Sequence, residues 1–286
     1  MTESGEAEAV YPPTTAVSRR IAAHTETVRA NRRWWDGAAD AYQAEHGDFL
    51  GDQRFTWGPE GVDEADLRLL GEVRNRRVLE IGCGAGQCSR WLTARGAWAV
   101  GLELSAGQLR HSRRLDHSTG VPVRVVHADA QRLPFVDGLF DIVCSAYGAY
   151  PFLQDLAGAF SEAYRVLRTG GRMVFAVAHP IRWCFLDEPG DGGLVAVHSY
   201  FDRRAYVEED GDGAATYVEH HHTIGDWVRA IHSAGLDLLD VIEPEWPAGN
   251  HNAWGGWSPL RGRLLPGTAI FVTRRPPSEA PTERPH

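Results

Sequence analysis

Three glycines spaced two apart follow an apolar run in the segment VLEIGCGAGQ, residues 78–87. The apolar residues predict a buried parallel strand, and residues 87–95 predict a helix that begins directly after the glycines. Backbone N–H groups at a helix start bind polar ligand atoms, and glycine lets a ligand approach the backbone closely because it has no Cβ. The segment therefore predicts a ligand-binding turn, although a glycine-rich turn of purely structural role is the alternative.

Glu80 decides between two classes of ligand. The dinucleotide fingerprint G-x-G-x-x-G places a pyrophosphate on a helix N-terminus, whereas this chain has Gly82, Gly84 and Gly86 with a carboxylate two positions before them. That carboxylate repels a pyrophosphate and attracts an ammonium group. A cationic nucleoside is indicated, and S-adenosyl-L-methionine, with its α-amino group and sulfonium, fits.

Acidic residues end the next two predicted strands. Residues 97–104 contain Glu103, which follows the glycines by roughly 20 residues, where nucleoside-binding α/β sheets hold a ribose diol. Residues 123–128 are followed by Asp129, which can accept a hydrogen bond from an adenine amino group. Two further strands, 140–145 and 172–177, are separated by a helix over 155–168.

At this point the chain resembles the class I S-adenosylmethionine-dependent methyltransferases, and within them the branch of the ubiquinone and menaquinone methyltransferases. The resemblance covers about residues 74–177 and is carried by the glycine turn with Glu80, by Glu103 and by the segments DA (129–130), LPF (133–135), FD (140–141) and VLRTGGR (166–172). Glu103 stands where many relatives have Asp, and either acid can bind a diol.

The resemblance implies the fold class and the reaction. We expect a Rossmann-like α/β fold with a mainly parallel seven-stranded sheet, helices on both faces, an N-terminal helical cap and a small inserted lid. The cofactor would be S-adenosyl-L-methionine, with S-adenosyl-L-homocysteine as product, and the reaction an O-, N- or C-methylation of a small molecule by in-line displacement. Alternatives are a protein or RNA methyltransferase, a cofactor-binding module without catalysis, and another reaction such as cyclisation.

The resemblance also assigns cofactor contacts by position. They fall in the glycine turn, at the ends of the next three strands and on the helical pattern 21–45 that precedes the sheet as a cap. The predicted residues are Glu80, Gly82, Cys83, Gly84, Gln87, Glu103, Leu104, Gln108, Asp129, Ala130, Ser145, Ala146, Tyr150, Trp34 and Tyr42. The neighbouring pair Trp34 and Trp35 suits a packed core equally well.

Two residues are candidates for chemistry. Tyr147 follows the fourth strand, where the donor meets the acceptor in the resembled fold. His179 follows the fifth strand, and an imidazole of pKa about 6.5 can take a proton from an acceptor hydroxyl at neutral pH. Structural roles are the alternative for both.

Residues 181–222 form an insertion relative to the resembled core. Segments 199–208 and 214–222 read as two strands around a Gly/Asp turn, and such a hairpin would cover the cleft. The predicted substrate contacts are Trp57, Arg182, Tyr200, Tyr217 and His222. Of the three consecutive histidines 220–222, only two share a strand face and no cysteine is near, so we expect no metal site.

The C-terminal part predicts a helix over 224–233 and strands over 236–243 and 268–273. The long link 244–267 contains Trp246, Trp254, Trp257 and Arg261. Long loops with aromatic residues are usually functional, and here a pocket wall and a dimer interface both remain open.

Composition limits which classes of partner the protein can have. The chain has 286 residues and a net charge of −9, which argues against nucleic acid as main partner. It lacks an apolar run long enough to span a membrane and a leader pattern, so we expect a cytoplasmic protein, possibly a homodimer. The expected organisation is a tail (1–18), a cap (19–70), a cofactor-binding core (71–180), a lid (181–222), the end of the core (223–274) and a second tail (275–286).

Overall fold

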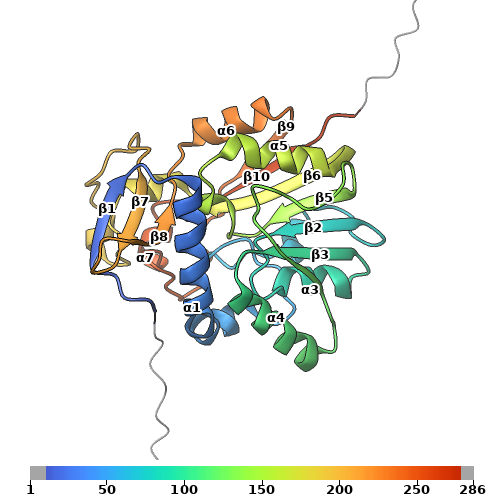
Figure 1. The fold of residues 1–286 in the computed structure, drawn as a ribbon, viewed down its shortest axis with the longest axis horizontal. Coiled ribbons are helices and arrows are strands. Elements are labelled where there is room, and N and C mark those ends of the chain that lie inside the picture. Colours follow the sequence, from blue (N-terminus) through green and yellow to red (C-terminus); the bar gives the residue numbers. More distant parts are fainter. Residues whose placement is uncertain (1–10, 278–286) are drawn as a thin grey trace, which may run out of the picture.

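The computed structural model describes residues 11–277, and a seven-stranded sheet forms their centre (Figure 1). The strand order is β4-β3-β2-β5-β6-β10-β9, and only β10 runs antiparallel to its neighbours. The strands are β2 (Arg77–Ile81), β3 (Trp98–Glu103), β4 (Arg124–His127), β5 (Phe140–Ser145), β6 (Leu167–Ala178), β9 (Asp237–Ile242) and β10 (Thr268–Arg274). The predicted Rossmann-like fold class is confirmed.

Helices cover both faces of this sheet. Helices α5 (Leu156–Val166) and α6 (Ile224–Ser233) pack on one face, and α3 (Gln87–Ala94) packs on the other. Because successive strand residues point to opposite faces, Leu79 belongs to the first core and its neighbour Val78 to the second. The remaining helices are α2 (Glu64–Leu67), α4 (Ala106–Thr119) and α7 (Pro259–Gly262), with 3₁₀ turns η1 (Tyr150–Phe152), η2 (Pro180–Cys184) and η3 (Asp191–Leu194).

Helix α1 (His24–Leu50) lies between the main sheet and a second, smaller sheet (Figure 1). The carboxylate of Asp36 fixes it to α4 by accepting hydrogen bonds from the Ser105 hydroxyl at 2.8 Å and the Gly107 N–H at 2.9 Å. A Cβ at Gly107 would lie 2.8 Å from the Asp36 carbonyl oxygen, so only glycine permits this approach. No helix among the described residues is long and apolar enough to cross a membrane.

The smaller sheet has the order β1-β7-β8 and consists of β1 (Ala16–Arg20), β7 (Ala205–Glu209) and β8 (Ala215–Glu219). The predicted hairpin is confirmed as β7 and β8.

Two N-terminal boundaries were wrong. The predicted tail over 1–18 extends too far, because β1 pairs antiparallel with β7 and Arg20 bonds Glu209 at 3.0 Å. The predicted helix 21–45 begins and ends later, at His24 and Leu50. A pairing partner almost 190 residues away leaves no local pattern. Residues 1–10 and 278–286, which the predicted tails include, lie outside the described part of the chain.

Asn31 joins α1 to the free edge of β8. Its Oδ1 accepts from the Val218 N–H at 2.8 Å, and its Nδ2 donates to the Val218 carbonyl at 2.9 Å. The side chain is 2% exposed. It thus satisfies two backbone groups that an unpaired strand edge would otherwise leave buried without partners.

We expect Asn31→Ala to lower the free energy of unfolding by about 2 to 4 kcal/mol, because both groups of Val218 lose their partner in a buried place. Urea unfolding followed by circular dichroism measures this loss. Arg29→Ala, a larger truncation on the exposed side of the same helix, serves as control and should change stability by less than about 0.5 kcal/mol. Equal losses in the two variants would contradict the role given to Asn31.

Candidate functional site

A cavity of about 350 Å³ lies at the carboxyl ends of the central strands, under α1 and the smaller sheet. Its floor is formed by residues that end or follow β2, β3, β5 and β6, among them Gly84, Glu103, Ala146 and Ala178. This is the edge at which open parallel sheets bind their ligands. Its volume is in the range of small-molecule sites.

The glycine turn after β2 forms one end of the cavity. Gly82, Gly84 and Gly86 have φ values of 72°, 53° and 77°, which non-glycine residues rarely adopt. A Cβ at Gly82 would lie 2.8 Å from that of Ala149, whereas a Cβ at Gly84 would meet only the Gln108 side chain, at 3.9 Å. A side chain at position 84 would therefore enter the cavity itself.

Glu80 lies under the turn and is 3% exposed. Its Oε2 accepts a hydrogen bond from the Ser89 hydroxyl at 2.5 Å. Burial raises the pKa of this carboxyl to about 7, and the hydrogen bonds from Ser89 and Cys88 oppose that rise. A cationic ligand group beside it would favour the ionised form.

Glu103 fastens the turn to the end of β3. Its carboxylate accepts from the Gly84 N–H at 2.9 Å and from the N–H groups of Leu104 and Ser105, both at 2.8 Å. Burial raises the pKa of Glu103, and these three donors oppose the rise. The carboxylate also lines the cavity, and Glu103 is the acid that the sequence predicts to bind a ribose diol.

Three amide side chains line the cavity side by side. Gln87 donates to Gln43 at 3.2 Å, and Gln43 donates to Gln108 at 2.9 Å. The Gln108 amide nitrogen is buried and has no hydrogen-bond partner within residues 11–277. A buried donor without a partner is costly, so this end of the cavity fits a polar ligand such as the implied cofactor.

Two other predicted contacts also line the cavity beside α1. The Asp129 Oδ1 accepts from the Gln131 N–H at 2.9 Å, and its Oδ2 lies 3.3 Å from His24 Nε2. The ring of Tyr42 packs edge-on against Trp35 and Trp254, with centroid distances of 5.2 and 6.0 Å.

An ion pair between the half-buried Arg182 and the buried Glu219 marks the other end of the cavity. Arg182 NH1 donates to Glu219 Oε1 at 3.1 Å, and the Tyr217 hydroxyl donates to Glu219 Oε2 at 3.2 Å. Asp187 lies 3.7 Å from the same guanidinium. All four line the cavity, as does Tyr147.

The sequence-predicted residues divide between the cavity and the rest of the fold. Those that line it are Glu80, Gly82, Cys83, Gly84, Gln87, Glu103, Leu104, Gln108, Asp129, Ala130, Ala146, Tyr42, Tyr147, Arg182 and Tyr217. Those that do not are Ser145, Tyr150, Trp34, Trp57, Tyr200, His222 and His179. Lining places a residue where it can touch a ligand, and the individual roles stay predictions.

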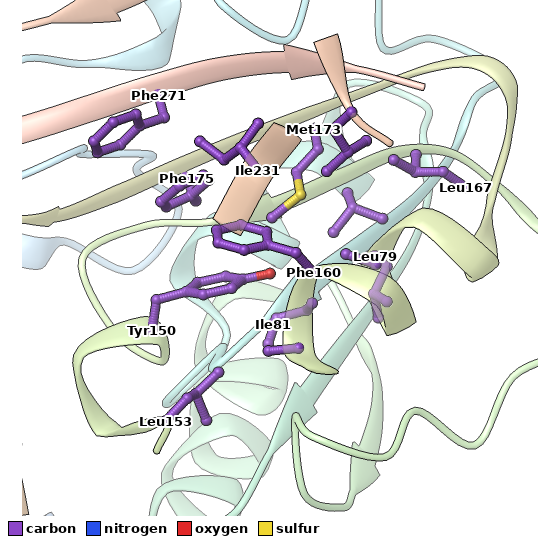
Figure 2. Close-up of a cluster of buried hydrophobic side chains, with 14 of the residues drawn as sticks. Leu79, Ile81, Tyr150, Leu153, Phe160, Leu167, Met173, Phe175, Ile231 and Phe271 are labelled. Atoms are coloured by element: carbon purple, nitrogen blue, oxygen red, sulfur yellow. The ribbon is translucent and has the colours of Figure 1, made fainter. Parts of the chain in front are cut away.

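Tyr150 is a core residue. It is 1% exposed, stacks on Phe160 with a centroid distance of 5.1 Å and packs at a tilt against Phe175 at 4.9 Å (Figure 2). Ser145 is likewise buried at the end of β5. Local sequence does not separate Tyr150 and Ser145 from residues that line the cavity, because all of them end or follow a strand at the same edge of the sheet.

Four further predicted contacts lie outside the cavity and have structural partners. The indole N–H of Trp57 donates to Glu64 at 3.1 Å, and the Tyr200 hydroxyl accepts from the Ile224 N–H at 2.9 Å at the start of α6. His222 packs edge-on against Trp227, and Trp34 packs against Tyr217. Trp34 thus supports a cavity residue without lining the cavity.

His179 does not line the cavity either. Its Nδ1 accepts from the Ile181 N–H at 3.1 Å, which begins η2, and its Nε2 lies 2.8 Å from the carboxylate of Glu243. Burial lowers the pKa of the imidazole, although Glu243 opposes this. The predicted role of general base does not fit a ring that faces Glu243 and the backbone of η2.

Sequence reasoning did not assign several lining residues. Glu219 could have been predicted from Tyr217, because residues two apart on a strand lie on the same face. The Trp254 and Trp257 rings also line the cavity, so the loop 246–261 contributes to its wall. Arg261 is 1% exposed and lies over the Trp257 ring at 4.5 Å, which makes it a support for that wall. Within the described residues, no three His, Cys, Asp or Glu side chains are grouped to hold a metal.

Comparisons with known proteins agree with this geometry. The methyltransferase domain family matches residues 79–175. A demethylmenaquinone methyltransferase from Thermus thermophilus is 41% identical over 111 residues, which are 38% of this chain and about half (49%) of that protein. One from Mycobacterium sp. (strain KMS) is 37% identical over 231 residues, covering 80% of this chain and 86% of the relative.

A solved structure of similar fold is also a methyltransferase. The crystal structure of an S-adenosylmethionine-dependent methyltransferase from Mesorhizobium loti is 26% identical, covers 76% of this chain and 100% of that one, and superposes with a TM-score of 0.56. A glycine turn, buried acids at the strand ends and sequence relatives over most of the chain point the same way. The chain belongs to the methyltransferase family and is an S-adenosyl-L-methionine-dependent methyltransferase.

Proposed function

We propose that this enzyme methylates a small molecule that binds between the glycine turn and the aromatic wall of the cavity. One observation carries the proposal: a single cavity is lined both by Gly84 and Glu103 at one end and by Arg182, Tyr217 and Trp254 at the other. Residues predicted to bind the cofactor and a second, different set of contacts thus face one cavity, as a two-substrate reaction requires.

The turn residues, Glu80, Glu103 and the three amides would hold the cofactor. When bound, S-adenosyl-L-methionine supplies the methyl group to the acceptor's lone pair by in-line displacement, with S-adenosyl-L-homocysteine as product. The buried Glu80 offers negative charge to a cationic ligand, and Gln108 offers a free amide donor. The chain's main contribution is to hold both reactants in one orientation, which supplies roughly 7 to 11 kcal/mol of barrier reduction in well-oriented systems.

Tyr147 belongs to the acceptor side of the cavity. Its backbone adopts φ 58°, a left-handed conformation that costs a tyrosine about 1 to 2 kcal/mol. Its ring packs edge-on against Trp254 at 6.3 Å. Strain of this kind persists where the surrounding structure enforces it and is common in active sites. It directs the Tyr147 ring at the cavity wall.

The aromatic wall of the cavity favours a small acceptor. Trp35, Phe152, Tyr217 and Trp254 leave few polar groups to recognise a polymer, and α1 and the hairpin cover the cavity. Both relatives named above act, by their names, on demethylmenaquinone, a small molecule. The charge of −9 disfavours RNA. A homodimer, a cytoplasmic location and the acceptor atom remain predictions.

Calorimetric titration with S-adenosylmethionine and S-adenosylhomocysteine, followed by an acceptor screen that detects S-adenosylhomocysteine release, tests the proposal. We expect micromolar or tighter cofactor binding, and release only with small aromatic acceptors. Release driven by protein or RNA and by none of the small molecules would overturn the small-molecule assignment.

Gly84→Asn should weaken S-adenosylhomocysteine binding at least about tenfold, because its side chain enters the cavity at the turn. Asparagine tolerates the left-handed conformation better than other side chains, so the fold should persist. Gly71→Asn is the matched control, since Gly71 has φ 74°, is exposed and has no atom within 4 Å of an added Cβ. Unchanged affinity in Gly84→Asn would place the cofactor elsewhere.

Replacing Tyr147 by glycine and by alanine separates its backbone strain from its ring. Glycine usually destabilises relative to alanine, by roughly 0.5 to 1 kcal/mol. At φ 58° the order should reverse, with Tyr147→Gly more stable than Tyr147→Ala by about 1 kcal/mol. Urea unfolding of the two variants decides this, and an alanine variant that is equally or more stable would show that the backbone relaxes.

His179→Asn tests the base predicted from sequence. A general base contributes roughly 10²- to 10⁴-fold to rate, whereas we expect turnover within about threefold of wild type. Asparagine can still accept the Ile181 N–H that begins η2. With an acceptor from the screen, a loss of about 100-fold at unchanged cofactor affinity would return His179 to the chemistry.

A further inference from the structure

The ion pair of Arg182 and Glu219 has no evident structural purpose. Glu219 is 5% exposed, and removing two charges from water costs several kcal/mol per ion, which their attraction often fails to offset. Apolar residues of similar size would stabilise the fold as well or better. A buried carboxylate paired with a half-buried arginine on a cavity wall therefore indicates a functional role.

The charges around Arg182 indicate what kind of group binds there. Its one positive charge faces two carboxylates, Glu219 at 3.1 Å and Asp187 at 3.7 Å. A further anion would be repelled, so an acidic substrate group at Arg182 is disfavoured. A neutral O–H group that can donate to Glu219 fits this balance of charges.

Aromatic residues surround the pair. Tyr217 packs edge-on against Phe152 at 5.6 Å, and Trp34 supports it from α1 at 5.1 Å. Tyr147 and Trp254 form another part of the same wall. Flat apolar side chains prefer offset or edge contacts with an aromatic ring, so the hydroxyl that meets Glu219 would be carried by a ring.

We propose that Glu219 is the general base of the reaction and takes the proton from an acceptor hydroxyl that an aromatic ring carries. This inference rests on the methyl transfer proposed above. The acceptor O–H bond breaks, its electron pair stays on the oxygen, and the proton joins Glu219. Arg182 then pairs with the phenolate. The net charge of the site is unchanged, and after product release Glu219 returns the proton to water.

The surroundings of Glu219 suit this transfer. Burial raises the pKa of Glu219 and Arg182 opposes the rise, so the carboxylate is more basic than a carboxylate in water. The charged and titratable groups near it are Arg182, Asp187, Tyr147, Tyr206, Glu208 and Tyr217. Burial raises the pKa of each of these three tyrosines, so they stay neutral and cannot replace Glu219 as base.

Chromogenic phenols test the proposal without knowledge of the natural acceptor. Para-nitrophenol and nitrocatechol absorb visible light only as phenolates, so absorbance reports the protonation state of the bound probe. The protein is saturated with S-adenosylhomocysteine and titrated with each probe at pH values below the pKa of the free probe. Cofactor binding, measured first, separates the two hypotheses, because its loss contradicts the proposed function whereas its presence leaves only the role of Glu219 in question.

In the wild type we expect bound phenolate and an affinity that barely changes with pH, because the proton passes to Glu219 inside the site. In Glu219→Gln the proton must go to solvent, so bound phenolate should require a higher pH and affinity for it should fall about tenfold per pH unit below the probe's pKa. Glu243→Gln, the same change at the carboxylate beside His179 and outside the cavity, should behave as wild type.

Tyr217→Phe provides a second test that keeps both charges. It removes the hydroxyl that donates to Glu219, so the carboxylate becomes more basic and the flat region of the affinity profile should end at a higher pH on its acid side. Three results would overturn the proposal: identical profiles for wild type and Glu219→Gln, loss of bound phenolate in Tyr217→Phe, or failure of both phenols to bind a wild-type protein that binds S-adenosylhomocysteine.

Discussion

The position of α1 is the constraint on which the site depends. Two polar side chains fix this helix: the buried Asn31 satisfies both backbone groups of Val218, and the half-buried Asp36 accepts from Ser105 and Gly107. One contact joins it to the smaller sheet and the other to the main sheet's helix α4. Because hydrogen bonds are directional and costly to leave unmade when buried, they set the helix position more narrowly than apolar packing alone. The helix then carries Tyr42 and Gln43 to the cavity.

The cavity collects buried carboxylates, and each is compensated differently. Glu103 is held by three backbone N–H groups, Glu80 by a serine hydroxyl, and Glu219 by an arginine and a tyrosine. Burial raises all three pKa values. Glu103 is fixed by the backbone and suits a constant binding role, whereas Glu219 is held by the side chain of Arg182, which would pair with the phenolate once Glu219 has taken the proton.

The two ends of the cavity have different origins in the chain. The cofactor end comes from the ends of β2, β3, β4 and β5, which succeed one another in a span of about 70 residues. The acceptor end gathers α1, the segment after β6, strand β8 and the loop with Trp254. Because of this division, the residues of the acceptor wall can change while the strand ends keep the cofactor residues in place. It also explains why the domain family matches residues 79–175 alone.

The sequence by itself determined the cofactor end, because a strand, a turn and a helix start that bind one ligand are contiguous. Gly82, Gly84, Glu80 and Glu103 are readable from spacing and residue type, and the alternating strands predict that their ends meet. Only the tertiary structure decided the acceptor end. The pairing of β1 with β7, the burial of Tyr150 and the contact of His179 with Glu243 depend on segments far apart in the chain. Which side chain faces a cavity and which faces a core is fixed by those long-range contacts, and they leave no periodic signal in the residues themselves.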